Sequence, residues 1–159
     1  MKNKLLLMMI GIFLLVFVVG CGSKDKTLEC SKITEDSSGF KIEETYNYKF
    51  VSNSVQTFEV MTISTPTKEE RKEFLSIFST NVDDSFNELD NKKGIEYSSE
   101  IKDDKHVLNI KINYDNVDLD EFDDASDEIN NIVNKKNKKI SLSETKKEME
   151  QAGYKCSSN

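Results

Sequence analysis

Residues 40–50 read FKIEETYNYKF, and the alternation in this stretch indicates the class of fold. Apolar and aromatic side chains at Phe40, Ile42, Tyr46, Tyr48 and Phe50 fall on one face of an extended chain, and Lys41, Glu43, Thr45, Asn47 and Lys49 fall on the other. A period of two residues is typical of a β-strand with one buried face and one face in water. Antiparallel sheets commonly have such a wet face, so the stretch predicts an antiparallel sheet.

Four other stretches carry strand signals. A short strand is expected over 28–34, and residues 55–65 are apolar on both faces around 60–63, which favours a central position. A hairpin is expected from 95–101 and 106–114, joined by the polar turn KDDK. The sequence therefore predicts five strands.

Two segments have helix signals with caps. Thr67 and Glu70 have the spacing of a capping box, and Ser141 and Glu144 have the same spacing. After Thr67, apolar residues recur at helical spacing up to a glycine stop at Gly94: Leu75, Phe78, Val82, Phe86 and Leu89, with Phe74 and Ile77 widening the stripe. After Ser141, Gly153 is suited to end the helix.

The acidic run that begins at Asp115 invites a calcium hypothesis. The EF-hand loop needs a glycine at its sixth position, and residues 115–139 contain none. Apolar residues instead recur at helical spacing from Val117 to Val133, with Asp118 placed to cap the helix and lysines from 135 to 139 beyond its negative end. We therefore expect one solvated helix here and no metal site.

The order of these elements predicts an α+β fold. It has about five mostly antiparallel strands, with three helices packed on one face of the sheet. Its closing residues, YKC at 154–156, return Cys156 toward the first strand if the cysteines pair.

The N-terminus resembles a bacterial secretory signal. Lys2 and Lys4 precede an uncharged apolar run over 5–19, which is shorter than the roughly 20 residues that a membrane-spanning helix needs. A single N-terminal anchor helix is the alternative interpretation. The run ends in VVGC at residues 18–21, which resembles the lipobox of bacterial lipoproteins.

That resemblance implies lipidation of the Cys21 thiol and cleavage between Gly20 and Cys21. Its consequences are a cleaved signal peptide at 1–20, a lipidated cysteine with a short polar tether at 21–27, and a single α+β domain at 28–159. The expected partner is the lipid bilayer, which two acyl chains such as palmitate hold stably. The expected location is the cell membrane, facing outside the cytoplasm.

The charge of the mature chain excludes one class of partner. Cleavage removes Lys2 and Lys4 from the 22 basic side chains and leaves 20 against 29 acidic ones, a formal charge of −9. A nucleic-acid-binding protein needs a basic surface, so no nucleic-acid partner is expected. The Lys- and Asn-rich composition is compatible with a Gram-positive cell envelope.

Cys30 and Cys156 remain after lipidation and lie near the two ends of the mature chain. Exported proteins occupy compartments where disulfides persist, so we expect a Cys30–Cys156 disulfide. Two buried free thiols are the alternative.

Catalytic signals are sparse. His106 is the only histidine, and its place at a hairpin turn predicts a surface residue. Without a second histidine or a reactive cysteine, the sequence offers few candidates for a catalytic Ser–His or Cys–His pair. The sequence therefore predicts no catalytic residue, no cofactor and no enzyme.

Four stretches resemble the YehR-like family of small bacterial lipoproteins of unknown function. They are TPTKEERKEF, KKGIEYSSEI, NIKINYDNVDLDEF and SETKKEMEQAGY, which lie between residues 65 and 154. The resemblance as a whole covers roughly residues 40 to 155. The resemblance implies a lipid-anchored α+β domain outside the cytoplasm and supplies no catalytic motif.

Two classes of function follow from these observations. The first is a non-catalytic envelope module that binds a small ligand, a cell-wall component or a protein. The alternative is an accessory subunit that docks onto a membrane protein complex. An exposed apolar patch would favour docking, and an apolar pocket with a few polar groups would favour ligand binding. A third possibility is that the cleaved signal peptide is itself released as a signal.

Overall fold

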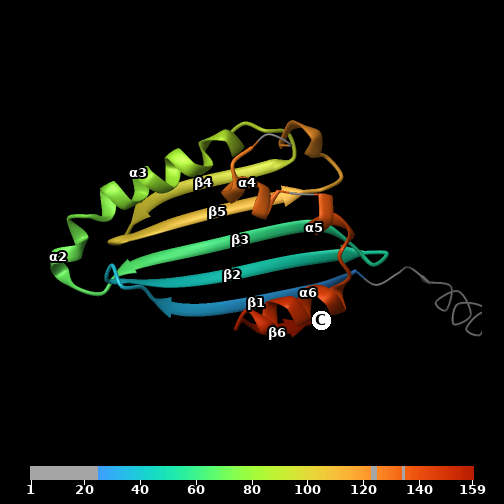
Figure 1. Cartoon of the computed structure of the whole chain (residues 1–159), viewed down its shortest axis with the longest axis horizontal. Coiled ribbons are helices and arrows are strands. Elements are labelled where there is room, and N and C mark those ends of the chain that lie inside the picture. Colours follow the sequence, from blue (N-terminus) through green and yellow to red (C-terminus); the bar gives the residue numbers. More distant parts are fainter. Residues whose placement is uncertain (1–24, 123–124, 134) are drawn as a thin grey trace, which may run out of the picture.

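The computed structural model describes residues 25–122, 125–133 and 135–159 and contains one six-stranded sheet (Figure 1). The strand order is β4-β5-β3-β2-β1-β6, and every neighbouring pair is antiparallel. The strands are β1 (Lys26–Glu35), β2 (Phe40–Val51), β3 (Ser54–Pro66), β4 (Ile95–Lys102), β5 (Lys105–Asn113) and β6 (Lys155–Ser158). The α+β class is confirmed, with six strands instead of five and with the strand at 54–66 near the centre.

Two tight hairpins fix the register of the sheet. Ser52 and Asn53 join β2 to β3, and Asp103 and Asp104 join β4 to β5; all four residues have positive φ. Two-residue loops of this kind match the right-handed twist of the flanking strands. The fixed register therefore keeps the apolar side chains of residues 40–50 on the buried face, because a shift of one residue in the strand pairing would move all of them to the opposite face.

All the helices lie on one side of the sheet. α4 (Asp127–Ile132), α5 (Lys135–Lys139) and α6 (Leu142–Gln151) lie over one face, and α3 (Leu75–Phe86) runs along β4 (Figure 1). A short α2 (Glu69–Lys72) precedes α3, and two 3₁₀ turns, η1 (Asn87–Leu89) and η2 (Leu119–Phe122), complete the set. Within the described ranges no helix lies on the opposite face, which we call the open face.

The hydrophobic core lies between the sheet and these helices. Strand residues Leu28, Phe58, Val60, Ile110 and Ile112 are buried, and Phe122, Ile129 and Val133 close the core from the helical side. Removing apolar surface from water contributes about 25 cal/mol per Å² to the free energy of unfolding, so this core makes the main contribution to the stability of the fold.

The expected helix from Thr67 to Gly94 is broken into α2, α3 and η1. Thr67 does not cap it; its hydroxyl and its amide both donate to the Gly39 carbonyl oxygen, at 2.9 Å each, so Thr67 is tied to the β1–β2 turn. The N-cap position is Lys68, without a side-chain cap. The helical segment already ends at Leu89 and not at Gly94, and Asn91 takes a positive φ of 62°. Gly94 lies in the turn before β4, with φ of +81° and a backbone so close to Val117 that a Cβ would lie 2.6 Å from the Val117 nitrogen.

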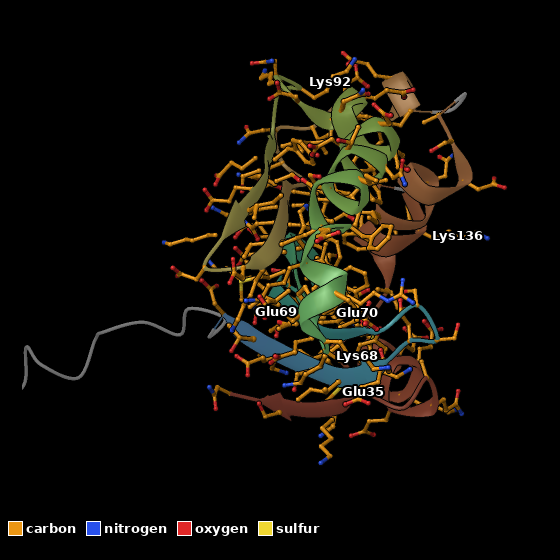
Figure 2. The ribbon with its side chains drawn as sticks, turned by 90° about the vertical axis from the view of Figure 1, so that its left-hand side faces the viewer. Glu35, Lys68, Glu69, Glu70, Lys92 and Lys136 are labelled. Atoms are coloured by element: carbon orange, nitrogen blue, oxygen red, sulfur yellow. A yellow bond between two sulfur atoms is a disulfide. The ribbon has the colours of Figure 1, made fainter. Side chains whose placement is uncertain are left out.

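The prediction of a single acidic helix after Asp118 is also wrong, because the segment forms η2, α4 and α5 instead. The Asp118 carboxylate accepts a hydrogen bond from the Asp120 amide, which favours a local turn, and Ser126 caps a separate helix by accepting from the Ile129 amide. Side chains of this kind compete with regular helix by bonding to nearby backbone. The lysines expected beyond the helix form α5 themselves, and Lys136 points away from the sheet into solvent (Figure 2).

The C-terminal segment follows the sequence pattern at its start and departs from it at its end. The capping box of Ser141 and Glu144 on α6 is confirmed in both directions. The chain then adds β6, a strand that the sequence did not predict. Cys30 and Cys156 face each other across β1 and β6 with their Cα atoms 4.1 Å apart, and a disulfide joins them.

Candidate functional site

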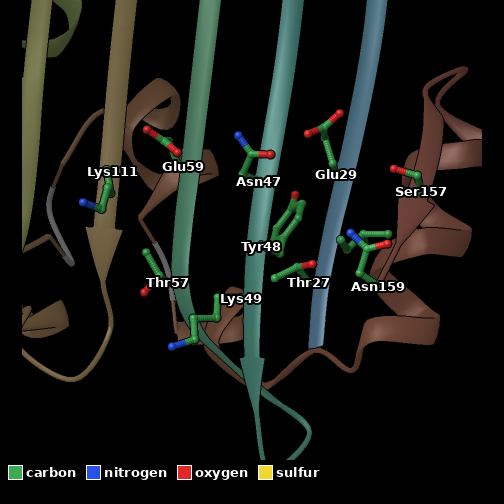
Figure 3. Close-up of a pocket in the computed structure, with 11 residues that line it drawn as sticks. Thr27, Glu29, Asn47, Tyr48, Lys49, Thr57, Glu59, Lys111, Ser157 and Asn159 are labelled. Atoms are coloured by element: carbon green, nitrogen blue, oxygen red, sulfur yellow. The ribbon is translucent and has the colours of Figure 1, made fainter. Parts of the chain in front are cut away.

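An open hollow of about 410 Å³ lies on the open face of the sheet (Figure 3). It lies toward the end of the sheet where β1 begins, which we call the tether end. We call the hollow the sheet trough, and its outward-facing side chains come from five neighbouring strands: Thr27, Glu29, Asn47, Lys49, Thr57, Glu59, Lys111, Ser157 and Asn159. The alternation that buries one face of these strands places this second set together on the other face.

A row of polar side chains crosses the middle of the trough. Glu29 pairs in register with Asn47, and Asn47 pairs with Glu59, so the amide lies between two carboxylates on adjacent strands (Figure 3). Within the described part of the chain, none of these three side chains has a hydrogen-bond partner. They are therefore available to an external molecule.

The two lysines that line the trough are already paired. The Lys111 ammonium, next to Glu59 in register, donates to both oxygens of Glu96 at 2.9 and 3.1 Å, and this pairing raises the Lys111 pKa. Lys49 pairs with Asp25 at 2.9 Å, just before β1 begins. The centre of the trough consequently carries carboxylate and amide groups, with cations at its margins.

A second hollow, of about 280 Å³, lies on the helical side of the sheet. We call it the α6 crevice. Its floor is aromatic, formed by Tyr46, Tyr48 and Phe58, and its walls include Ile132, Ile140 and Met149, with Glu148 beside them. It matches the usual description of a ligand pocket, which is an apolar hollow with a few polar groups.

His106 is buried, and the surface position predicted for it is wrong. Its side chain is 1% exposed, its ring lies edge-on to Phe78 of α3, and its Nε2 is 2.8 Å from the Ser99 hydroxyl. The hairpin turn is only two residues long, so His106 already lies within β5 on the face that α3 covers. Burial lowers its pKa, although the nearby Asp83 carboxylate acts in the opposite direction.

A pH dependence of stability follows from this burial. The pKa of His106 lies below its ordinary value of 6.5, so the unfolded chain binds a proton first as the pH falls. We expect the free energy of unfolding to decrease as the pH falls from 7 to 5.5, and His106→Gln to flatten the curve in that window. Urea denaturation at a series of pH values measures this, and the one histidine resonance in NMR reports the midpoint directly. A midpoint above 6.5 would contradict the prediction.

The predicted cleavage and lipidation residues and four of the tyrosines lie in different parts of the chain. Gly20 and Cys21 lie outside the described residues. Tyr46 and Tyr48 form the crevice floor, whereas Tyr114 is buried in the core. The Tyr97 hydroxyl donates to Asp83 at 2.8 Å. In the described ranges there is no group of three or more histidine, cysteine, aspartate or glutamate residues arranged to hold a metal ion, and no helix long and apolar enough to cross a membrane.

A family model matches residues 29–155 and describes a protein of unknown function, DUF1307. The chain belongs to this family. The matched region includes the central row of the sheet trough and all of the α6 crevice, whereas Thr27, Ser157 and Asn159 at one side of the trough lie outside it. No curated protein sequence matches the chain.

Two solved structures share the DUF1307 chain's fold. The first is an NMR structure of a protein from Streptococcus pneumoniae TIGR4, with a TM-score of 0.60, 10% identity, and coverage of 88% of this chain and 90% of that one. The second is the NMR structure of the E. coli YehR protein, with a TM-score of 0.53, 18% identity, and coverage of 85% and 92%. At such low identities the likeness shows the fold alone. With the family match, it supports the YehR-like resemblance found in the sequence.

The sequence did not point to either hollow. The polar residues of the trough were visible as the wet face of a strand, but nothing in a single strand shows which of them share a row. The crevice joins residues 46 to 149 of the DUF1307 chain, and only the return of α6 across the sheet brings them together.

Proposed function

We propose that this chain is a lipid-anchored envelope module outside the cytoplasm, without catalytic activity, that binds a polar component of the cell envelope in the sheet trough. The observation that carries this proposal is the row of Glu29, Asn47 and Glu59, whose polar groups face an open hollow without partners in the described chain.

The anchoring part of the proposal rests on the VVGC motif and on the length of the tether. Thr27, at the edge of the trough, follows Cys21 by six residues, which span at most about 20 Å when extended. A lipid on Cys21 therefore keeps the tether end of the sheet close to the bilayer, and the trough near the base of the envelope.

The chemistry of the trough suits a hydroxyl- and amide-rich partner. The carboxylates of Glu29 and Glu59 accept hydrogen bonds, whereas the Asn47 amide both donates and accepts. Cell-wall polymers of sugars and short peptides present these complementary groups. The trough has little aromatic surface for stacking, so hydrogen bonds account for its selectivity.

A sedimentation experiment tests this function. The full-length protein is mixed with purified insoluble cell wall and centrifuged, and the bound fraction is measured. We expect the natural chain to sediment and Asn47→Leu, which keeps the shape but removes the hydrogen bonds, to reduce binding at least about fivefold, the effect of one lost hydrogen bond of roughly 1 kcal/mol. Glu100→Gln, on β4 outside the trough, is the matched control and should bind normally.

Either of two outcomes would contradict the trough proposal: no sedimentation of the natural chain, or equal sedimentation of Asn47→Leu. The accessory-subunit alternative has one observation in its favour. Phe74 just before α3, Ile77 on α3 and Ile101 near the end of β4 are about half exposed at the end of the sheet away from the tether. A photocrosslinker at position 77 that captures one membrane protein, when the same group at position 35 does not, would favour docking.

A further inference from the structure

The walls of the α6 crevice leave apolar surface without neighbours. Ile140 and Met149 are only partly buried although they pack against the core, and the rings of Tyr48 and Phe58, with centroids 5.1 Å apart, form the floor between them. Side chains around such a hollow lack the dispersion contacts that a filled core supplies. An apolar group placed there would gain those contacts and would lose its own hydration.

One side of the crevice is polar. The Tyr48 hydroxyl donates to the Met149 sulfur at 3.8 Å, and a thioether is a weak acceptor. Burial raises the Tyr48 pKa, with smaller contributions from Tyr46, Tyr114 and last the Glu148 carboxylate, so the phenol keeps its proton and stays a donor. Two polar groups therefore line the same crevice. The Tyr48 hydroxyl has only a weak acceptor, and the Glu148 carboxylate has no hydrogen-bond partner in the described part of the chain.

We propose that the α6 crevice binds a compact, uncharged apolar molecule that carries an amide group. The apolar part lies on Tyr46, Tyr48 and Phe58. The amide oxygen accepts a hydrogen bond from Tyr48, which replaces the weak bond to sulfur, and the amide N–H donates to Glu148. The site is separate from the sheet trough, since the two hollows lie on opposite sides of the sheet.

Size and charge limit the ligand further. The crevice, at about 280 Å³, is just below the usual range of volumes for small-molecule sites, so the ligand is small. The Glu148 carboxylate repels anions, so a fatty acid or any carboxylate that presents its charge at this side binds more weakly than an uncharged amide. An amide satisfies both polar groups at once, whereas an alkane satisfies neither.

The test uses phenylacetamide as the probe and phenylacetate, its anionic counterpart of nearly equal shape, as the comparison. The full-length chain in lipid nanodiscs carries isotope-labelled methionine and isoleucine methyl groups, and each probe is titrated by NMR. We expect phenylacetamide to shift the methyl signals of Met149 and Ile140 saturably, with a Kd at least tenfold lower than that of phenylacetate.

Three variants distinguish specific binding in the crevice from nonspecific hydrophobic binding. Tyr48→Phe should weaken phenylacetamide binding at least fivefold, and Glu148→Gln should remove most of the discrimination against phenylacetate. Tyr97→Phe changes a tyrosine whose hydroxyl bonds to α3, and it should leave the affinity unchanged. Because Glu148 is exposed, its variant stays informative even if Tyr48→Phe is unstable. Absence of saturable shifts, or equal binding of the two probes by the natural chain, would overturn the proposal.

Discussion

Cys21→Ala is expected to abolish lipid attachment and to leave the protein either as an unprocessed precursor or as a form released from the membrane. The thiol of Cys21 is the only atom in the VVGC motif that can form the thioether to a diacylglyceryl group. Two acyl chains at roughly 0.8 kcal/mol per buried CH₂ make the anchored state stable, so losing them is an all-or-none change. Metabolic labelling with an alkyne fatty acid, followed by gel analysis of the membrane fraction, measures it.

Cys156→Ser is the matched control for this experiment. It removes another cysteine but should leave labelling and processing at the level of the natural chain. Lipid labelling and normal processing of Cys21→Ala would refute the anchor. The single-helix alternative predicts membrane association of both variants and label in neither.

The double variant Cys30→Ser/Cys156→Ser is expected to lose about 4–5 kcal/mol of unfolding free energy. The bond joins residues separated by 126 positions, and in the chain-entropy model a long loop gives a stabilisation of this size. The effect has a structural component as well, because β6 has only four residues and pairs with β1 alone. Urea denaturation of the oxidised natural chain and of the double variant measures the difference.

Reduction of the natural chain is the control, since it removes the same bond without changing side-chain volume. Its unfolding free energy should fall to a similar extent. Mass spectrometry under non-reducing conditions should show the loss of two hydrogens. Two alkylatable thiols in the folded mature protein, or a loss below about 1 kcal/mol, would contradict the prediction.

The same bond also affects both hollows. β6 contributes Ser157, and Asn159 directly after it, to one wall of the sheet trough, and α6, which precedes β6, contributes Met149 to the crevice. Two other contacts hold this segment: the Lys32 ammonium donates to the Ala152 carbonyl oxygen at 2.9 Å, and the Tyr154 hydroxyl donates to Glu44 at 3.0 Å. In the double variant we therefore expect weaker binding at both hollows along with the lower stability.

The sequence-based predictions were correct for features that depend on residues close together in the chain. The alternation over 40–50 depends only on which side chains lie in water, and the Ser141–Glu144 capping box depends on groups three residues apart. The predictions were wrong where a residue distant in the sequence binds a group that was expected to make a local contact. Thr67 satisfies the Gly39 carbonyl instead of capping a helix, and Phe74 and Ile77, placed on the buried stripe by spacing, are exposed because the helix breaks just before Leu75.

An antiparallel α+β sheet with one solvent-exposed face and a layer of helices could be predicted from the sequence, because hydrophobic periods of 2 and 3.6 residues depend only on neighbouring residues in the chain. The tertiary structure alone decided that β6 exists, that His106 is buried beneath α3, and which polar residues meet across five strands in the trough. These features depend on contacts between residues far apart in the chain, whose free energy appears only when packing brings them together.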